Sequence, residues 1–195
     1  MMIHLASRTT QSKLNRFTKD QVQPNAIDLR VESIHGKNNK PFAIDEDEKL
    51  HRGIAPCPMK DDYYLLDNGV YEIIMEGIIT IGPNEAGYLI TRSTLNRNGL
   101  FITSGLYDSG YSGVMAGVLH VSGGLASIKK GTRVAQFLLF KAESIKQYDG
   151  DYGVDSEHDQ EYNANTSSQM EMHYYDEGKH WEFDKNNTLV EKKEK

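Results

Sequence analysis

The sequence predicts a mainly β fold, because short segments typical of strands alternate with tight turns between residues 63 and 140. The segments are rich in Val, Ile, Tyr, Phe and Thr, and the turn sequences DNG, GPNEAG, DSGYSG, SGG and KKG separate them. Strands at intervals of about eight to twelve residues indicate an antiparallel sandwich or barrel rather than βαβ units. The predicted strands are residues 63–66, 70–76, 78–81, 87–92, 100–103, 114–122, 126–128 and 132–140.

The segment before residue 63 is less regular. Residues 27–31 alternate aliphatic and charged side chains after a Gln-Pro-Asn turn signal, which predicts a half-buried strand. Residues 5–22 show weak helical spacing and predict only a short helix. Residues 35–62 are rich in Gly, Asn, Asp, Glu and Pro, so we expect a long loop there, with a short strand at residues 42–44.

Charge divides the chain of 195 residues into two parts. Residues 1–148 contain 15 acidic and 17 basic residues, whereas residues 149–195 contain 13 acidic residues and 5 lysines. The latter begin with a stretch almost free of aliphatic residues, which cannot bury enough surface to fold alone. We therefore predict a β domain over residues 1–148 and a polar, acidic C-terminal extension over residues 149–195.

The composition also excludes several classes of protein. No run of apolar residues is long enough for a membrane span, and the N-terminus lacks the basic-then-apolar order of a signal peptide. The single Cys57 excludes an internal disulfide framework and a Cys-rich zinc site of the deaminase type. The acidic extension argues against a nucleic-acid binder. These features predict a cytoplasmic protein, in a bacterium or in a host cell if the source is viral.

A set of polar residues in TRSTLNRNGL predicts an anion-binding site. Arg92, Ser93, Thr94 and Arg97 lie within six residues of one another. Guanidinium groups bind phosphate through paired N–H donors, and hydroxyl groups supply further donors. Asp108 follows in the turn DSGYSG, and such loops often present catalytic carboxylates. The same residues are also compatible with a polar surface strand and an ordinary turn.

Four segments in this order resemble the central motifs of the trimeric dUTPase and dCTP deaminase superfamily. They are QPNAIDLRV, TRSTLNRNGL, GLYDSGYSG and KKGTRVAQFLLF, and the resemblance covers residues 23–152. It implies a distorted β-barrel or jelly-roll subunit and a homotrimer with active sites shared between chains. It also implies a deoxypyrimidine nucleoside triphosphate as substrate, with Mg2+.

The resemblance assigns a role to each polar residue of the second and fourth motifs. Arg92 and Ser93 match positions that hold phosphates in both branches of the superfamily. Thr94 and Arg97 match a serine and an arginine of the deaminase branch. Gln136, in the fourth motif, matches a residue that helps to bind the phosphates.

The third motif implies the groups that contact the sugar and the base. Asp108 matches the carboxylate that contacts the 3′-hydroxyl and, in dUTPases, positions the attacking water. Tyr111 matches a tyrosine that packs under the deoxyribose. The hairpin of residues 99–108 corresponds to an element that reads the pyrimidine through its backbone, and we place Ile102, Thr103 and Gly105 in that role.

Two further residues complete the implied site. Asp28 matches a position near the metal–water and phosphate network, where it would contact Mg2+ through water. Tyr152 matches a tyrosine near the triphosphate in the deaminase branch. Independently, Mg2+ suits phosphoanhydride hydrolysis because it takes phosphate oxygens together with waters and one or two carboxylates.

The motifs point to both branches of the superfamily. The first motif and YDGDYGVD resemble deaminases, whereas GLYDSGYSG resembles dUTPases. Deaminases of this family carry a water-activating glutamate at the position of Val118, and an apolar side chain cannot accept a proton. His120 would share the face of Val118 only in a regularly alternating strand, and we expect no catalytic role for it.

The sequence therefore favours dUTP diphosphatase activity, dUTP + H2O to dUMP + diphosphate, with dCTP as a further substrate. The alternatives are a mono- or bifunctional dCTP deaminase and a catalytically weak nucleotide-binding or regulatory protein. The glycine-rich phosphate-covering motif of dUTPases is absent from the sequence. Residues 150–170 could instead close over the triphosphate, with Tyr152, Ser167, Ser168 and Gln169 as donors, or form a flexible tail or a trimer arm.

Overall fold

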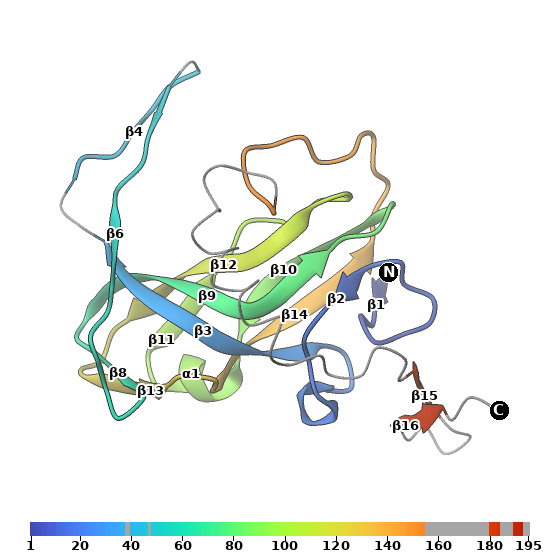
Figure 1. Cartoon of the computed structure of the whole chain (residues 1–195), viewed down its shortest axis with the longest axis horizontal. Helices are drawn as coiled ribbons and strands as arrows, with labels where there is room; N and C mark the ends of the chain where they lie inside the picture. The colour runs from blue at the N-terminus through green and yellow to red at the C-terminus, as the bar shows by residue number, and fades with distance from the viewer. Residues whose placement is uncertain (38–39, 47, 155–179, 184–188, 193–195) are drawn as a thin grey trace.

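The computed structural model confirms the mainly β fold (Figure 1). It describes residues 1–195 except 38–39, 47, 155–179, 184–188 and 193–195. The strands are β1 (Met2–Ile3), β2 (Lys13–Leu14), β3 (Ile27–Lys37), β4 (Ala43–Ile44), β5 (Lys49–Leu50), β6 (Ile54–Pro56), β7 (Met59–Lys60), β8 (Tyr63–Leu66), β9 (Gly69–Thr80), β10 (Glu85–Thr91), β11 (Leu100–Thr103), β12 (Ser112–Val121), β13 (Ala126–Lys129), β14 (Arg133–Lys141), β15 (His180–Phe183) and β16 (Leu189–Lys192). The helices are η1 (Lys19–Gln21) and α1 (Ser93–Arg97).

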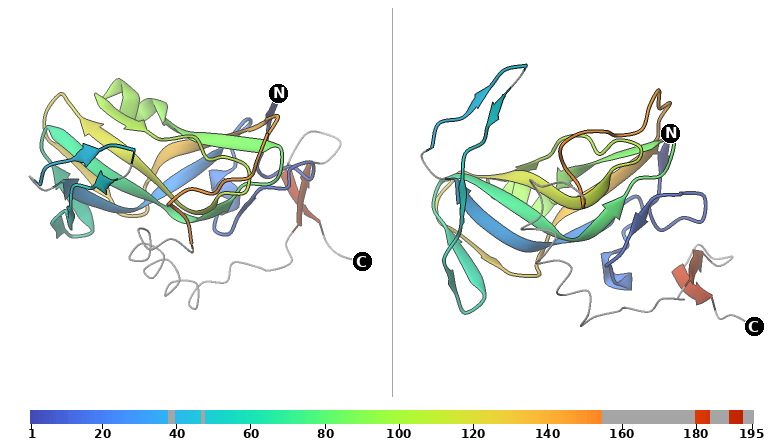
Figure 2. Two further views of the ribbon diagram at one scale, coloured as in Figure 1. Left: turned by 90° about the horizontal axis from the view of Figure 1, so that it is seen from above. Right: turned by 45° about the horizontal axis from the view of Figure 1, so that its top comes forward.

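The main sheet runs in the order β1-β14-β3-β9-β12-β11, with β10 paired to β14, β2 to β9 and β6 to β3. Strand β3 connects its two halves, because residues 27–30 pair with β14 and residues 31–36 pair with β9. Register shifts at Val31–Ser33 and Arg133–Ala135 accompany this change of partner. Both faces of β3 are consequently covered, which gives the curved, barrel-like arrangement seen in Figure 2. The core contains Ile27, Leu29, Ile73, Met75, Met115, Leu119 and Phe137.

The structure corrects several boundaries. Residues 70–76 and 78–81 form the single strand β9, in which Gly77 has a φ of +88° and allows a local irregularity without a break. Residues 35–62 contain more strands than expected, since β3 extends into them and β5 to β7 follow β4, which forms where the short strand was predicted. Hairpin β4–β5 projects from the body with Phe42, Ile44 and Leu50 exposed (Figure 2). Its exposure explains why it lacks the apolar alternation of a half-buried strand.

The helices also differ from expectation. Residues 5–22 contain only the short η1 and strand β2. Helix α1 was not predicted, because five residues are too few to show helical periodicity. Asn98 ends it by donating from Nδ2 to the Thr94 carbonyl at 2.7 Å, and Gly99 follows with a φ of +78°. A Cβ at residue 99 would lie 2.3 Å from the Ser122 carbonyl oxygen, so this position requires glycine.

The predicted domain boundary remains a prediction. Residues 149–154 are described and contact the body, for example through the Val154 amide, which donates to the Ser112 carbonyl at 2.9 Å. Residues 155–179, with Ser167, Ser168 and Gln169 of the expected lid, lie outside the described part of the chain. Within the described residues, no helix combines the length and the apolar character needed to cross a membrane.

A fully buried carboxylate attaches the N-terminal segment to the sheet. Glu85 accepts hydrogen bonds from the hydroxyls of Thr10 and Ser12, both at 2.6 Å, and from the amides of Gln11 and Ser12. Lys141 Nζ lies 2.8 Å from Glu85 Oε1. Burial alone raises the pKa of a carboxyl group, but Lys141, the two hydroxyls and the Gln11 amide outweigh it and lower the pKa of Glu85 to about 2.

This pKa predicts a loss of stability in acid. The folded-state pKa lies below the ordinary value of 4.5, so the contribution is complete above pH 4.5 and is lost as the pH falls towards about 2. We expect Glu85 to account for about 3 kcal/mol of the acid-dependent change in unfolding free energy. Denaturant titrations at pH 6 and pH 2.5 should show that change in wild type and in Glu143→Gln, an exposed control, but a smaller change in Glu85→Gln. Equal changes in all three proteins would contradict this assignment.

Candidate active site

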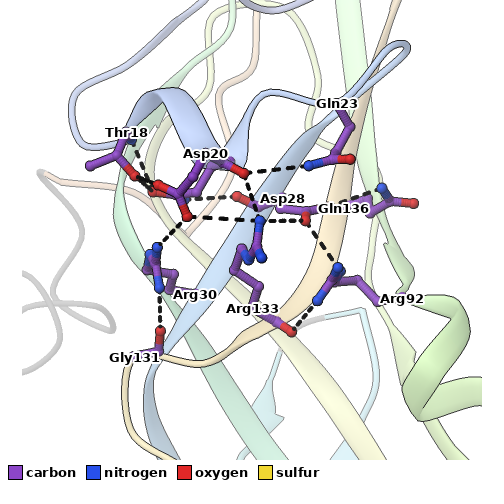
Figure 3. Close-up of polar contacts among 10 residues, drawn as sticks. Thr18, Asp20, Gln23, Asp28, Arg30, Arg92, Gly131, Arg133 and Gln136 are labelled. Carbon is purple, nitrogen blue, oxygen red and sulfur yellow. Dashed lines mark hydrogen bonds and ion pairs between the residues drawn. The ribbon is translucent and has the colours of Figure 1, made fainter.

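A buried carboxylate fixes the first predicted phosphate ligand. Asp28 on β3 and Gln136 on β14 are directly opposite in the sheet, and Gln136 Nε2 donates to Asp28 Oδ1 at 3.0 Å. Arg92, which follows β10, places its Nε 3.2 Å from Asp28 Oδ2 (Figure 3). The Asp28 side chain is fully buried, whereas that of Arg92 is 29% exposed. Arg92 Nη1 also donates to the Arg133 carbonyl at 3.1 Å, so two sides of the guanidinium group are held and only part of it remains accessible.

Arg133, Asp20 and Arg30 extend this cluster and were missed in the sequence. Arg133 Nη1 lies 3.6 Å from Asp28 Oδ2 and donates to the Asp20 carbonyl at 2.6 Å. Asp20 also accepts from Arg30 Nη2 at 2.8 Å, and its pKa is lowered by a hydrogen bond from Thr18 and by the two arginines, against the effect of burial. Three arginines thus surround two carboxylates (Figure 3), and the surplus positive charge favours an anion.

Helix α1 places the remaining predicted phosphate ligands beside this cluster. Ser93, Thr94 and Arg97 are exposed on α1, directly after Arg92. The structure therefore brings together Arg92, the α1 side chains, Gln136 and Asp28. Asp28 Oδ1 accepts a hydrogen bond from Gln136, whereas the buried Oδ2 has no hydrogen-bond partner among the described residues and lies 3.2 Å from Arg92 Nε, which argues for an electrostatic role in holding Arg92. Its predicted water-mediated contact with a metal stays a prediction.

Asp108 lies at the other end of β10. Its neighbour Tyr107 exchanges two backbone hydrogen bonds with Gly87, at 2.8 and 3.0 Å. Gly87 and Arg92 are five positions apart in the chain, and an extended chain advances about 3.4 Å per residue, so Asp108 lies on the order of 17 Å from the arginine cluster. Tyr107 and Ser109 are buried, whereas Asp108 is exposed and no described residue bonds to its carboxylate. One chain therefore does not bring Asp108 to Arg92.

Some backbone groups of the predicted base-reading hairpin already form hydrogen bonds within the chain. The Thr91 hydroxyl accepts from the Ile102 amide at 2.7 Å and donates to the Ile102 carbonyl at 3.1 Å, so both backbone groups of Ile102 have partners. Thr103 and Gly105 are exposed, and the Gly105 carbonyl accepts from Ser104. Tyr111 is buried, with its hydroxyl donating to the Val114 carbonyl at 2.7 Å. Its predicted contact with deoxyribose would therefore use only an edge of the ring.

A carboxylate lies opposite the position at which deamination was expected to fail. Val118 on β12 pairs with Thr103 on one side and with Glu72 on the other. Directly opposite residues in an antiparallel pair project from the same face, with Cβ atoms about 5 Å apart. Glu72 also contacts Lys37 Nζ at 2.6 Å and is 15% exposed. β12 alternates regularly here, so His120 shares this face.

The remaining predictions concern Tyr152 and the metal. Tyr152 is exposed, and its amide donates to the Tyr148 hydroxyl at 3.2 Å. Among the described residues, no group of three or more His, Cys, Asp or Glu side chains could hold a metal ion.

Comparisons with known proteins show what the chain is similar to. A family model described as dCTP deaminase-like matches residues 2–142. A probable deoxyuridine 5′-triphosphate nucleotidohydrolase from Halobacterium salinarum is 33% identical over 139 residues, covering 68% of this chain and 83% of that protein. The deoxyuridine 5′-triphosphate nucleotidohydrolase of Methanocaldococcus jannaschii is 31% identical over 153 residues, covering 76% and 97%.

A solved structure shares the fold. The 2′-deoxycytidine 5′-triphosphate deaminase from Agrobacterium tumefaciens superposes with a TM-score of 0.52 at 18% identity. The match covers 70% of this chain but only 45% of that deaminase, so this chain spans less than half of it. The shared fold agrees with the family match and with the relatives at 31–33% identity. The chain belongs to the dCTP deaminase-like family, within the dUTPase and dCTP deaminase superfamily.

Proposed function

We propose that the protein hydrolyses dUTP to dUMP and diphosphate, with dCTP as a further substrate. The observation that carries the proposal is Arg92, held by the buried Asp28 within a cluster of surplus positive charge and next to the exposed hydroxyls of α1. Such a surface suits a polyphosphate. The relatives from Halobacterium salinarum and Methanocaldococcus jannaschii, named for this reaction, support the choice of substrate.

In this proposal, one group of residues binds the phosphates and another residue activates the attacking water, as phosphoryl transfer requires. Arg92, Ser93, Thr94 and Arg97 bind phosphate oxygens and neutralise the charge that develops on the leaving diphosphate. Asp108 accepts a hydrogen bond from the attacking water, aligns it with the scissile P–O bond and takes its proton. Water then supplies the oxygen of the new P–O bond, and the bond to the leaving phosphate oxygen breaks.

The separation of Arg92 and Asp108 along β10 supports active sites shared between copies of the chain. A triphosphate held at Arg92 of one copy would meet Asp108 of a second copy. We propose the homotrimer implied by the motifs as the assembly, since a closed ring repeats one head-to-tail contact at every site.

We propose Mg2+ as the cation, which would be bound together with the triphosphate. The described residues offer no cluster of ligands of their own, so phosphate oxygens and waters would complete its coordination, with Asp28 contacting at most one of those waters. When bound, Mg2+ neutralises negative charge on the phosphates. A cytoplasmic location, where such nucleotides occur, belongs to the same proposal.

Product analysis tests the reaction directly. The purified protein is incubated with dUTP or with dCTP, each with Mg2+, and the products are resolved by chromatography. We expect dUMP and diphosphate from dUTP, and dCMP from dCTP at a lower rate. A protein that binds dUTP but releases no dUMP would instead be the nucleotide-binding or regulatory family member.

The position of Glu72 favours a second candidate, dCTP deamination. Water would add to cytosine C4 while the Glu72 carboxylate takes a proton from it, and the proton would pass to the leaving amino group. The C4–N bond breaks and ammonia leaves. The cross-strand pairing of Glu72 with Val118 supports this candidate, because directly opposite residues project from the same face of the sheet.

If this second activity exists, Glu72→Gln should abolish ammonia release from dCTP, because an amide cannot take up the proton. Hydrolysis of dUTP should change less than about 3-fold, since Glu72 does not contact the arginine cluster. A coupled ammonia assay measures the first rate and chromatography the second, with Lys37→Met as the control that removes only the partner of Glu72. Wild-type protein that releases no ammonia from dCTP would eliminate the candidate.

A further inference from the structure

The segment after β14 returns across the loop that carries Asp108. We call residues 142–154 the strap; it is orange in Figure 2. The Ala142 amide donates to the Asn84 carbonyl at 2.9 Å, where the strap begins. The Tyr148 amide donates to the Ser109 carbonyl at 2.7 Å, and the Val154 amide to the Ser112 carbonyl at 2.9 Å. The strap therefore bonds to both ends of the loop formed by residues 109–112.

Ser109 is the centre of these contacts. Its hydroxyl donates to the Glu85 carbonyl at 2.7 Å and accepts from the Glu85 amide at 3.2 Å. The Ser144 hydroxyl lies 2.6 Å from the same oxygen and must donate, because a hydroxyl has one hydrogen. Ser109 is 2% exposed, so losing a partner there would leave a buried polar group unsatisfied. Ser144 thus completes the bonding of the residue next to Asp108.

Aromatic contacts hold the other side of the loop. The ring of Tyr148 packs edge-on against Tyr111, with centroids 5.4 Å apart, and Tyr111 packs against Tyr107 at 5.3 Å. Close backbone approach continues to the end of the strap, because a Cβ at Gly113 would lie 2.8 Å from Gly153 Cα. Asp108 is exposed between these fixed neighbours. Its backbone is thereby immobilised from both directions while its carboxylate faces outward.

We propose that the strap sets the position of Asp108, with Ser144 and Tyr148 as positioning residues. The inference rests on the proposed hydrolysis, in which Asp108 aligns the water. A segment that only covered apolar surface would not need the hydrogen bond from the half-buried Ser144 to the buried Ser109. A shift of about 1 Å in a water-aligning carboxylate can reduce turnover by on the order of 100-fold. The strap is therefore part of the geometry of the active site, in which Ser144 and Tyr148 act through Asp108 and do not touch substrate.

The test compares Ser144→Ala and Tyr148→Leu with Lys146→Ala in the full-length chain. Lys146 lies on the same strap, but its contact is an exposed ion pair with Asp149, so this variant is the matched control. Hydrogen exchange measures the amides of Gly110 and Tyr111, which bond to Ile81 and Asp108. We expect exchange at both amides to accelerate at least about 10-fold in the two strap variants and to remain unchanged in the control.

Steady-state kinetics with dUTP supply the second measurement. We expect kcat to fall about 10-fold in Ser144→Ala and Tyr148→Leu at temperatures where both are fully folded, with KM within about 2-fold of wild type. Unchanged hydrogen exchange in both strap variants would show that the strap does not restrain the loop of residues 109–112. Faster exchange with unchanged kcat would overturn the positioning role, since a structural contact alone changes only the first measurement. If wild type hydrolyses no dUTP, the proposed function falls and the positioning role with it, whereas hydrogen exchange still decides whether the strap holds the loop.

Discussion

Asp108→Asn is expected to lower kcat for dUTP by on the order of 1000-fold while KM changes little. An amide keeps the size of the carboxylate and can still contact the sugar 3′-hydroxyl, but it cannot accept the proton of the attacking water. The side chain is exposed and no described residue bonds to it, so the fold should be unaffected. Measuring initial rates of diphosphate release, together with thermal unfolding, separates the two effects.

Asp67→Asn is the matched control for this change. Asp67 is also exposed, and the structure uses only its backbone carbonyl, which accepts from the Tyr71 hydroxyl at 3.0 Å. The control should retain wild-type kcat. Full hydrolysis by Asp108→Asn would eliminate the assigned mechanism, even if the nucleotide still bound tightly.

Arg92→Ala should affect both activity and stability. Removing a charged hydrogen-bond donor from the phosphates should reduce kcat/KM about 100-fold. The same change deprives the fully buried Asp28 of its nearest cation, 3.2 Å away. Breaking a buried ion pair from one side leaves a charge uncompensated, and because Arg133 and Gln136 remain we expect a loss of about 3 kcal/mol in unfolding free energy. Urea denaturation measures this loss.

Two further variants distinguish the causes. Arg97→Ala lies on the same helix but is exposed, so it should reduce activity without lowering the midpoint of unfolding. Adding Asp28→Asn to Arg92→Ala should recover part of the lost stability without recovering activity, since it removes the buried negative charge. An Arg92→Ala protein as stable as wild type would contradict the role assigned to Asp28.

The sequence predicted the strands well where one face of each is buried. The turns DNG and DSGYSG, and the β-branched segments between them, correspond to observed connections and strands. It predicted strands less well where they form only by pairing with distant parts of the chain. Residues 35–62 carry few aliphatic residues, yet β6 forms because its backbone pairs with the end of β3. Composition cannot show such pairing, since the partner lies about 20 residues away.

The candidate site was predicted in part for a similar reason. Arg92 and Asp108 could be chosen because their residue types match phosphate chemistry and occur in recognisable motifs. Arg133 stood in a quoted motif, but only the register of β14 against β3 brings it to Asp28. Ser109 and Ser144 are ordinary serines in turn-rich sequence, and their bonding depends on the fold alone. Contacts made across the sheet leave no local signature.

The position of the Gly87–Tyr107 bridge at the far end of β10 from Arg92 has a consequence for mixed populations of the protein. If each site takes its arginines from one copy and its aspartate from the next, a copy defective at Arg92 and a copy defective at Asp108 damage different sites. Co-assembled, the two inactive proteins would create some sites with both groups intact. A cell carrying both alleles would then regain activity that neither allele supplies alone. A copy defective at both positions would instead be dominant-negative, because it would inactivate both of the sites to which it contributes.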